Sequence, residues 1–119
     1  MRKALLLAAT LIPAGAAATP LRCTWTERSA CGPENGCRPV PAATWALLDV
    51  DGREYQRCDA KGCDAYSAVI SRSGAYTLVD LPGRGMFAKL GDDGRATEVV
   101  SLGHGVLVSQ GRCILAQGQ

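Results

Sequence analysis

The sequence has little of several residue types on which common functions depend. Histidine occurs once, as His104, and aromatic residues make up only 5% of the 119 residues. A single histidine limits both zinc binding and acid–base catalysis, because each normally needs further ligands or partners. A C-x-x-C motif is also missing, which argues against a thioredoxin-like redox role.

A large excess of charge of either sign is missing too. The chain has 13 Lys and Arg against 11 Asp and Glu, a formal net charge of +2. Two of the basic residues, Arg2 and Lys3, belong to a segment that we expect to be removed, which leaves a nearly neutral chain. Such a chain lacks the basic surface that nucleic acids and anionic membranes attract, so we expect no nucleic-acid partner.

Residues 1–18 have the three parts of a secretory signal peptide. A basic start is followed by an apolar stretch over residues 4–12 and a run of small residues, with cleavage expected within Ala16–Thr19. The apolar stretch is shorter than the roughly 18 residues that a transmembrane helix needs, so no membrane insertion is expected after cleavage. We expect a periplasmic or secreted protein in which residues 19–119 form a single domain.

All six cysteines lie beyond the expected cleavage site. They are Cys23, Cys31, Cys37, Cys58, Cys63 and Cys113. An even number of cysteines in a short exported chain indicates a disulfide framework. Zinc is the alternative, but structural zinc sites favour C-x₂₋₄-C pairs or paired histidines, and only Cys58-x₄-Cys63 reaches that range.

Six cysteines allow many pairings, and the sequence alone does not choose among them. A hairpin that turns at Ala60-Lys61 would nevertheless align a disulfide, an aromatic pair and an opposite-charge pair in one register. These pairs are Cys58 with Cys63, Tyr55 with Tyr66, and Arg57 with Asp64. In the same scheme Cys31 and Cys37 enclose a turn-rich loop, and Cys23 with Cys113 would tie the first strand to the last and seal the edge of the barrel.

Alternating polarity and frequent turn residues predict an all-β fold. The chain has 14 glycines and six prolines at short intervals, which limits each element to a few residues and argues against long helices. The predicted strands are residues 21–26, 44–50, 53–58, 64–71, 75–80, 86–90, 96–102 and 106–115, and residues 27–43 are expected to be irregular. We predict a small antiparallel meander of about eight strands, closed or nearly closed into a disulfide-stabilised barrel.

The few large aromatic side chains divide between core and surface. We assign three of them to the core: Trp25, Trp45 and Phe87. Tyr55 and Tyr66 are predicted to form a ledge beside the Cys58/Cys63 hairpin, and with Arg57 and Asp64 they are a possible binding patch. Simple stabilisation of the hairpin by cross-strand pairs is the alternative explanation of the same four residues.

Three other sequence patterns give weak indications of a catalytic or binding function. His104 would need a nucleophile and an orienting carboxylate to act as a catalytic base, and the sequence supplies neither at a recognisable spacing. Gly83-x-Gly85-x-x-Ala88 matches a dinucleotide fingerprint but has no helix after it. Asp92-Asp93-Gly94 is too short for a calcium loop and is typical of a turn. No cofactor and no metal are expected.

Two resemblances carry further expectations. The segment from Tyr55 to Tyr66, with Arg57-Cys58-Asp59 and Gly62-Cys63-Asp64, resembles small exported bacterial proteins of unknown function, as does Gly111-Arg112-Cys113. This resemblance implies export and disulfides. Ser73-Gly74-Ala75-Tyr76 is similar to the inhibitory loop of periplasmic inhibitors of animal-type lysozyme, which are small disulfide-bearing barrels. That similarity implies an inhibitory role for Ser73 and Tyr76.

The leading functional prediction is an exported, non-enzymatic binding or envelope-associated protein. It depends on the signal peptide, the six cysteines and the missing catalytic pattern. The alternatives are an inhibitor of a cell-wall hydrolase, which would use Ser73 and Tyr76, and a small hydrolase that uses His104. The sequence does not identify the partner, for which a protein of the envelope is one candidate.

Overall fold

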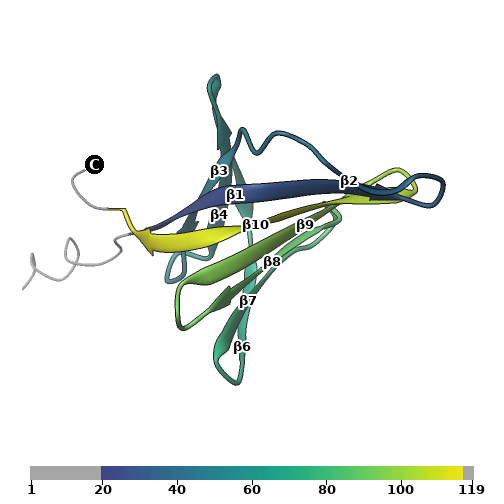
Figure 1. The fold of residues 1–119 in the computed structure, drawn as a ribbon. Helices are drawn as coiled ribbons and strands as arrows, with labels where there is room; N and C mark the ends of the chain where they lie inside the picture. Colours follow the sequence, from purple (N-terminus) through teal and green to yellow (C-terminus); the bar gives the residue numbers. More distant parts are fainter. Residues whose placement is uncertain (1–19, 117–119) are drawn as a thin grey trace, which may run out of the picture.

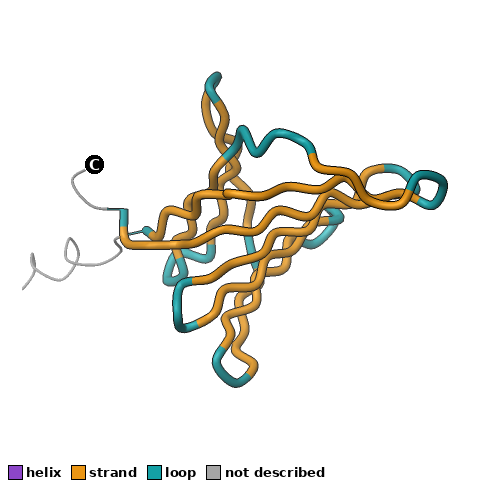
Figure 2. Tube along the Cα trace, in the orientation of Figure 1, coloured by secondary structure: helices purple, strands orange, loops and turns teal. Residues whose placement is uncertain are grey.

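Strands make up most of the described chain. A computed structural model describes residues 20–116, in which ten strands form one sheet and no helix occurs (Figures 1 and 2). The strands are β1 (Leu21–Gly32), β2 (Gly36–Pro39), β3 (Trp45–Asp49), β4 (Glu54–Asp59), β5 (Gly62–Ser67), β6 (Val69–Ser73), β7 (Tyr76–Leu81), β8 (Met86–Gly91), β9 (Arg95–Leu102) and β10 (Gly105–Leu115). The expected signal peptide and its cleavage site lie outside the described residues.

The sheet nearly closes into a barrel because its two ends are consecutive in the chain. Its strand order is β5-β4-β3-β1-β10-β9-β8-β7-β6, with β2 paired to β1 alone. Only Ala68 separates β5 from β6, and the Ala68 N–H donates to the Arg53 carbonyl at 2.9 Å. The continuous segment Gly62–Ser73 therefore pairs with β4 through its first half and with β7 through its second. The predicted all-β barrel is confirmed.

Two of the predicted strand boundaries are wrong. Residues 64–71, expected as one strand, bend at Ala68 because the first half pairs with one neighbour and the second half with another. Residues 27–43, expected to be irregular, contain the second half of β1 and all of β2. That half of β1 is strand because β10 and β2 hydrogen-bond to its two edges, a partnership that local sequence does not show.

The predicted hairpin and all three disulfides are confirmed. Strands β4 and β5 pair in the expected register around the Ala60-Lys61 turn, where the Lys61 N–H donates to Asp59 Oδ1 at 2.8 Å. The disulfides are Cys23–Cys113, Cys31–Cys37 and Cys58–Cys63. Contrary to expectation, Cys23–Cys113 lies in the middle of the hydrogen-bonded sheet, and the sheet edges are β5 and β6.

Alternation along the strands places the core inside the barrel. The buried core residues are Cys23, Trp25, Ala46, Leu48, Tyr55, Ala68, Val79, Leu81, Met86, Ala88, Ala96, Val100 and Cys113. Trp25 is buried as predicted, and Trp45 is half-buried with the Arg22 guanidinium 4.9 Å from its ring centroid. The prediction for Phe87 is wrong: it is 43% exposed, because its neighbours Met86 and Ala88 take the inward positions of β8.

Strands β1 and β10 approach each other closely at a β-bulge. The register shifts between Trp25 and Glu27, opposite Gly111 of β10. A Cβ at Gly111 would lie 1.9 Å from the Thr24 carbonyl oxygen, so no side chain fits there. Bulges increase the local twist of a strand pair, and the paired strands continue well past this point.

The ends of the two longest strands project beyond the barrel. β1 has 12 residues and β10 has 11, and their paired ends extend together with β2 and the end of β9 (Figure 1, right-hand side). We call this projection the overhang, and it comprises residues 29–39 and 101–107. We call the opposite end of the barrel, with the β6–β7 and β8–β9 turns, the base. Residues 20–116 contain no helix that is long and apolar enough to cross a membrane.

Candidate functional site

A buried polar network spans the barrel lumen. Glu98 of β9 is 1% exposed and accepts a hydrogen bond from the Tyr55 hydroxyl at 2.6 Å. Arg57 of β4 donates to both Glu98 oxygens, from Nε and from Nη2, each at 3.2 Å. Three strands, β3, β1 and β10, separate β4 from β9 in the sheet, so these contacts connect two walls of the barrel.

A second arginine belongs to the same interior. Arg28 Nε donates to Ser109 Oγ at 2.8 Å, and Arg28 Nη2 donates to the Thr44 hydroxyl. Burial lowers the pKa of Arg28, and the charge of Glu98 opposes that effect. The middle of the barrel is therefore occupied by polar side chains that are hydrogen-bonded to one another.

Burial and the adjacent carboxylate of Glu98 raise the pKa of Tyr55 far above its ordinary value. The Tyr55 hydroxyl therefore keeps its proton over the accessible pH range and remains a hydrogen-bond donor to Glu98. This hydrogen bond connects β4 with β9 through the lumen.

The predicted hairpin patch is not a single surface. Its residues are direct partners as expected, but the exposed ledge predicted for Tyr55 is wrong, because Tyr55 is buried in the lumen. Arg57 turns inward to Glu98, whereas Asp64 opposite it is exposed. Tyr66 is half-buried, with the Arg84 guanidinium 5.1 Å from its ring centroid.

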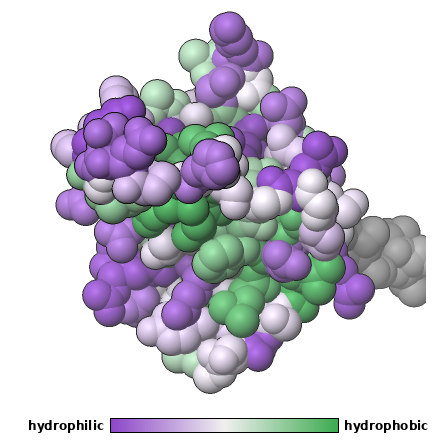
Figure 3. Space-filling view, turned by 90° about the vertical axis from the view of Figure 1, so that its right-hand side faces the viewer, coloured by the Kyte–Doolittle hydropathy of each residue, from purple (hydrophilic) through white to green (hydrophobic). Residues whose placement is uncertain are grey.

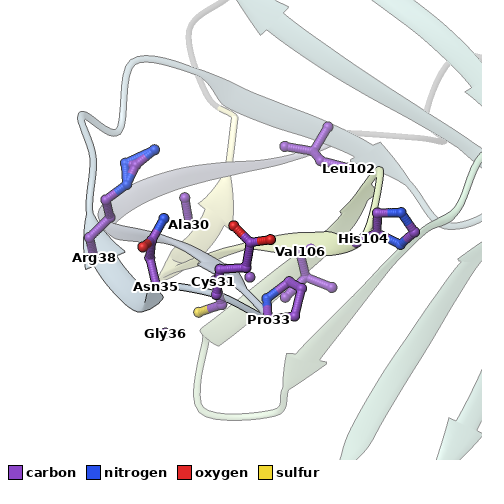
Figure 4. A pocket seen from close by; sticks show the side chains of 12 residues that line it. Ala30, Cys31, Pro33, Asn35, Gly36, Arg38, Leu102, His104 and Val106 are labelled. Atoms are coloured by element: carbon purple, nitrogen blue, oxygen red, sulfur yellow. The ribbon is translucent and has the colours of Figure 1, made fainter.

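The overhang holds a pocket of about 390 Å³ (Figure 4). The β1–β2 hairpin and the β9–β10 turn line it, with Leu102 at 54% exposure. His104 is also among the lining residues, which include no serine, and their one cysteine, Cys31, is held in a disulfide with Cys37. Seen from the overhang side, areas of hydrophobic surface lie among hydrophilic residues (Figure 3).

A second concavity, which we call the outer groove, lies on the outer face of the sheet at the base. It measures about 650 Å³ and crosses β8, β9, β10 and the bulge of β1. Its lining residues are Thr26, Glu27, Tyr76, Lys89, Asp93, Arg95, Ala96, Thr97, Gln110, Gly111 and Arg112. Most of them are exposed and carry hydroxyl, amide or charged groups.

Ser73 and Tyr76 flank the β6–β7 turn at the base. They are direct partners across the hairpin, and Tyr76 is exposed. Arg72 braces this turn, with Nη1 and Nη2 at 2.9 and 3.1 Å from the two Asp92 carboxylate oxygens. The hydrogen bond from Arg72 is the main cause of the lowered pKa of Asp92. The loop is therefore presented to solvent in a braced conformation.

The remaining motifs form turns. Gly83 and Gly85 belong to the β7–β8 turn, and Asp92 to Gly94 form the β8–β9 turn, as expected. The backbone N–H and side chain of Arg95 lower the pKa of Asp93. Within residues 20–116, no three His, Cys, Asp or Glu residues are grouped so that they could hold a metal ion.

Sequence reasoning missed Glu98 and Arg28. A signal was present for Glu98, since it is a charged residue between Ala96 and Val100 on the otherwise apolar inward face of β9. Arg28 gave no such signal, because the bulge between Trp25 and Glu27 interrupts the alternation of β1. Comparison with known proteins adds no further assignment: no family model, curated protein or solved structure matches the chain.

Proposed function

We propose that the protein is an exported, non-enzymatic binding protein of the periplasm or the extracellular space that contacts a protein partner through the overhang. One observation carries this proposal. The overhang exposes Leu102 beside a pocket, and Cys31–Cys37 cross-links its β1–β2 hairpin, in which all four residues of β2 are exposed. A projection that is rigid before binding loses less conformational entropy when a partner binds.

Two further features support the proposal. Three intramolecular disulfides fit an oxidising environment outside the cytoplasm. The pocket that contains His104 offers no hydroxyl of serine and no free thiol among its lining residues, so nothing there could serve as the nucleophile of a Ser–His or Cys–His pair.

Site-specific photo-crosslinking in cells tests the overhang. A photoreactive residue replaces Leu102, and in a matched control it replaces Ile114, which is 67% exposed at the other end of β10. We expect one discrete protein adduct from position 102 that disappears when Cys31 and Cys37 are both changed to Ala. Equal adducts from both positions, or none from position 102, contradict the proposal, as does a catalytic turnover that His104→Ala abolishes.

A second candidate function is inhibition of a cell-wall hydrolase through the β6–β7 turn. It is supported by the exposed Tyr76 and by the brace that Arg72 and Asp92 provide for the turn. Purified protein in molar excess should then slow lysozyme, and Ser73→Ala with Tyr76→Ala should restore its rate, whereas a change at Leu102 should not. Lysozyme activity that is unchanged by the wild-type protein would remove this candidate.

A further inference from the structure

Two arginines of the outer groove face each other across a strand pair. Arg95 of β9 and Arg112 of β10 are direct Cα partners, and both are exposed. Like charges directly opposite each other in a sheet are destabilising. An unfavourable pair of this kind, in a sheet whose other features favour the fold, is expected mainly at functional sites. The pair therefore calls for an explanation other than stability.

The nearest carboxylate, that of Asp93, forms an ion pair with only one of the two arginines. Arg95 Nε lies 2.8 Å from Asp93 Oδ2, so Asp93 is paired with Arg95. Arg112 Nη1 reaches only the Asp93 carbonyl oxygen, at 3.2 Å. Within residues 20–116, Arg112 forms no ion pair. One of the two guanidinium groups thus remains available to an external anion.

A glycine of β8 lets the Asp93 carboxylate approach the sheet beside these arginines. A Cβ at Gly91 would be 2.8 Å from Asp93 Oδ1, 3.4 Å from Tyr76 Cε1 and 3.6 Å from the Arg95 carbonyl oxygen. Gly91 therefore leaves room for a carboxylate that neutralises part of the positive charge here. Tyr76 and both arginines line the same groove.

The next row of the groove supplies hydrogen-bonding groups and a third cation. Glu27, Gln110, Thr97 and Lys89 are successive cross-strand partners over four neighbouring strands, a span of roughly 14 Å at the usual strand spacing. Lys89 Nζ lies 4.3 Å from the Tyr76 ring centroid and makes no ion pair within residues 20–116. This row adds a hydroxyl group, an amide group and the carboxylate of Glu27, so the groove lining carries three cations and two carboxylates.

We propose that the outer groove binds an acidic carbohydrate, with the anionic group between Arg95 and Arg112 and a sugar ring against Tyr76. Guanidinium groups bind carboxylate, phosphate and sulfate oxygens through paired hydrogen bonds. Thr97 and Gln110 can each donate and accept, which suits sugar hydroxyls. The groove is at the base, so this binding is separate from partner contact through the overhang.

Titration calorimetry of the disulfide-intact protein tests the proposal. The probes are oligogalacturonate for carboxylates, heparin oligosaccharide for sulfates, phosphorylated oligomannose for phosphates, and neutral dextran. We expect binding of at least one acidic probe and none of dextran. Arg112→Ala should weaken that binding by about tenfold to a hundredfold, the loss typical of a charge-assisted hydrogen-bonded pair. The matched control is Lys61→Ala, which removes an exposed cation from the β4–β5 turn.

Stability provides an independent readout of the same site. Because Arg112→Ala removes one member of a like-charge pair, its midpoint of urea unfolding should equal or exceed that of the wild type. Several outcomes overturn the proposal: no acidic probe binds at low salt, dextran binds equally well, Lys61→Ala weakens binding as much as Arg112→Ala, or Arg112→Ala clearly lowers the unfolding midpoint. Arg112→Lys, which keeps the charge without the planar fork, should show intermediate affinity.

Discussion

The barrel body and the overhang both contain a disulfide and charged side chains, but the body buries a disulfide and a carboxylate, whereas these groups lie at the surface in the overhang. Cys23–Cys113 is buried in the body and joins residues 90 positions apart, whereas Cys31–Cys37 is at the surface and joins residues six apart. In the body, Arg57 is bound to a carboxylate that is 1% exposed, whereas Arg38 of the overhang is exposed to solvent. The disulfide and the charged network of the body are therefore buried, whereas the disulfide and the charged side chain of the overhang lie at the surface.

The largest expected difference concerns the two disulfides. Changing Cys23 and Cys113 to Ala should lower the free energy of unfolding by about 4 to 5 kcal/mol, because that bond closes a long loop in the unfolded chain. Changing Cys31 and Cys37 to Ala should cost about 2 kcal/mol, since its loop is short. Urea unfolding of both variants at one pH measures the difference. Equal losses would show that the overhang folds as part of the barrel core.

A smaller effect is expected from the lumen network. Glu98→Gln should lower the free energy of unfolding by about 3 kcal/mol, because it leaves the Arg57 charge inside the barrel without its partner. Asp92→Asn, which removes the carboxylate of the exposed pair with Arg72, is the matched control and should hardly change the unfolding midpoint. A similar midpoint for both variants would mean that the buried network contributes no more than a surface ion pair.

The smallest effect is a dependence on alkaline pH. Because the folded state raises the pKa of Tyr55 above its unfolded value of about 10, folding favours the protonated phenol. This contribution is fully present below pH 10 and is lost above it, by up to about 1.4 kcal/mol per pH unit. Tyr55→Phe lacks it, so the stability difference between wild type and variant should narrow as the pH rises above 10.

Urea unfolding between pH 8 and pH 11 measures this trend, with Tyr76→Phe as the control at an exposed tyrosine. A stability difference between wild type and Tyr55→Phe that stays constant over this range would show that burial and Glu98 do not raise the pKa of Tyr55 in the folded state. The hydrogen bond between Tyr55 and Glu98 would then add no pH-dependent stability to the barrel body.

Features that depend on short stretches of chain were predictable. The β4–β5 hairpin shows this best, because its turn and its three cross-strand pairs lie within about a dozen consecutive residues and agree on one register. The alternation of the strands likewise predicted the all-β barrel. Phe87 shows the limit of such reasoning. Its strand could be recognised, but which of its two faces points inward depends on Met86 and Ala88 packing against β7 and β9.

Features that depend on distant pairs were not predictable. Tyr55 and Glu98 are 43 positions apart, and only the closed barrel brings them together. The facing of Arg95 and Arg112 follows from the β9–β10 register, and the length of the overhang follows from the pairing of β1 with β10. The residues near each of these positions in the sequence do not indicate which distant residue becomes its neighbour.

The sequence by itself determined that this chain forms short antiparallel strands, where the β4–β5 hairpin turns and that its cysteines are cross-linked. Those properties follow from side-chain alternation, turn residues and cysteine count, which act over a few residues. Only the tertiary structure decided which charged side chains are buried, which strands extend beyond the barrel and which arginines face each other. These three features depend on closure of the sheet, because closure determines which strands are neighbours even when they are far apart in the sequence.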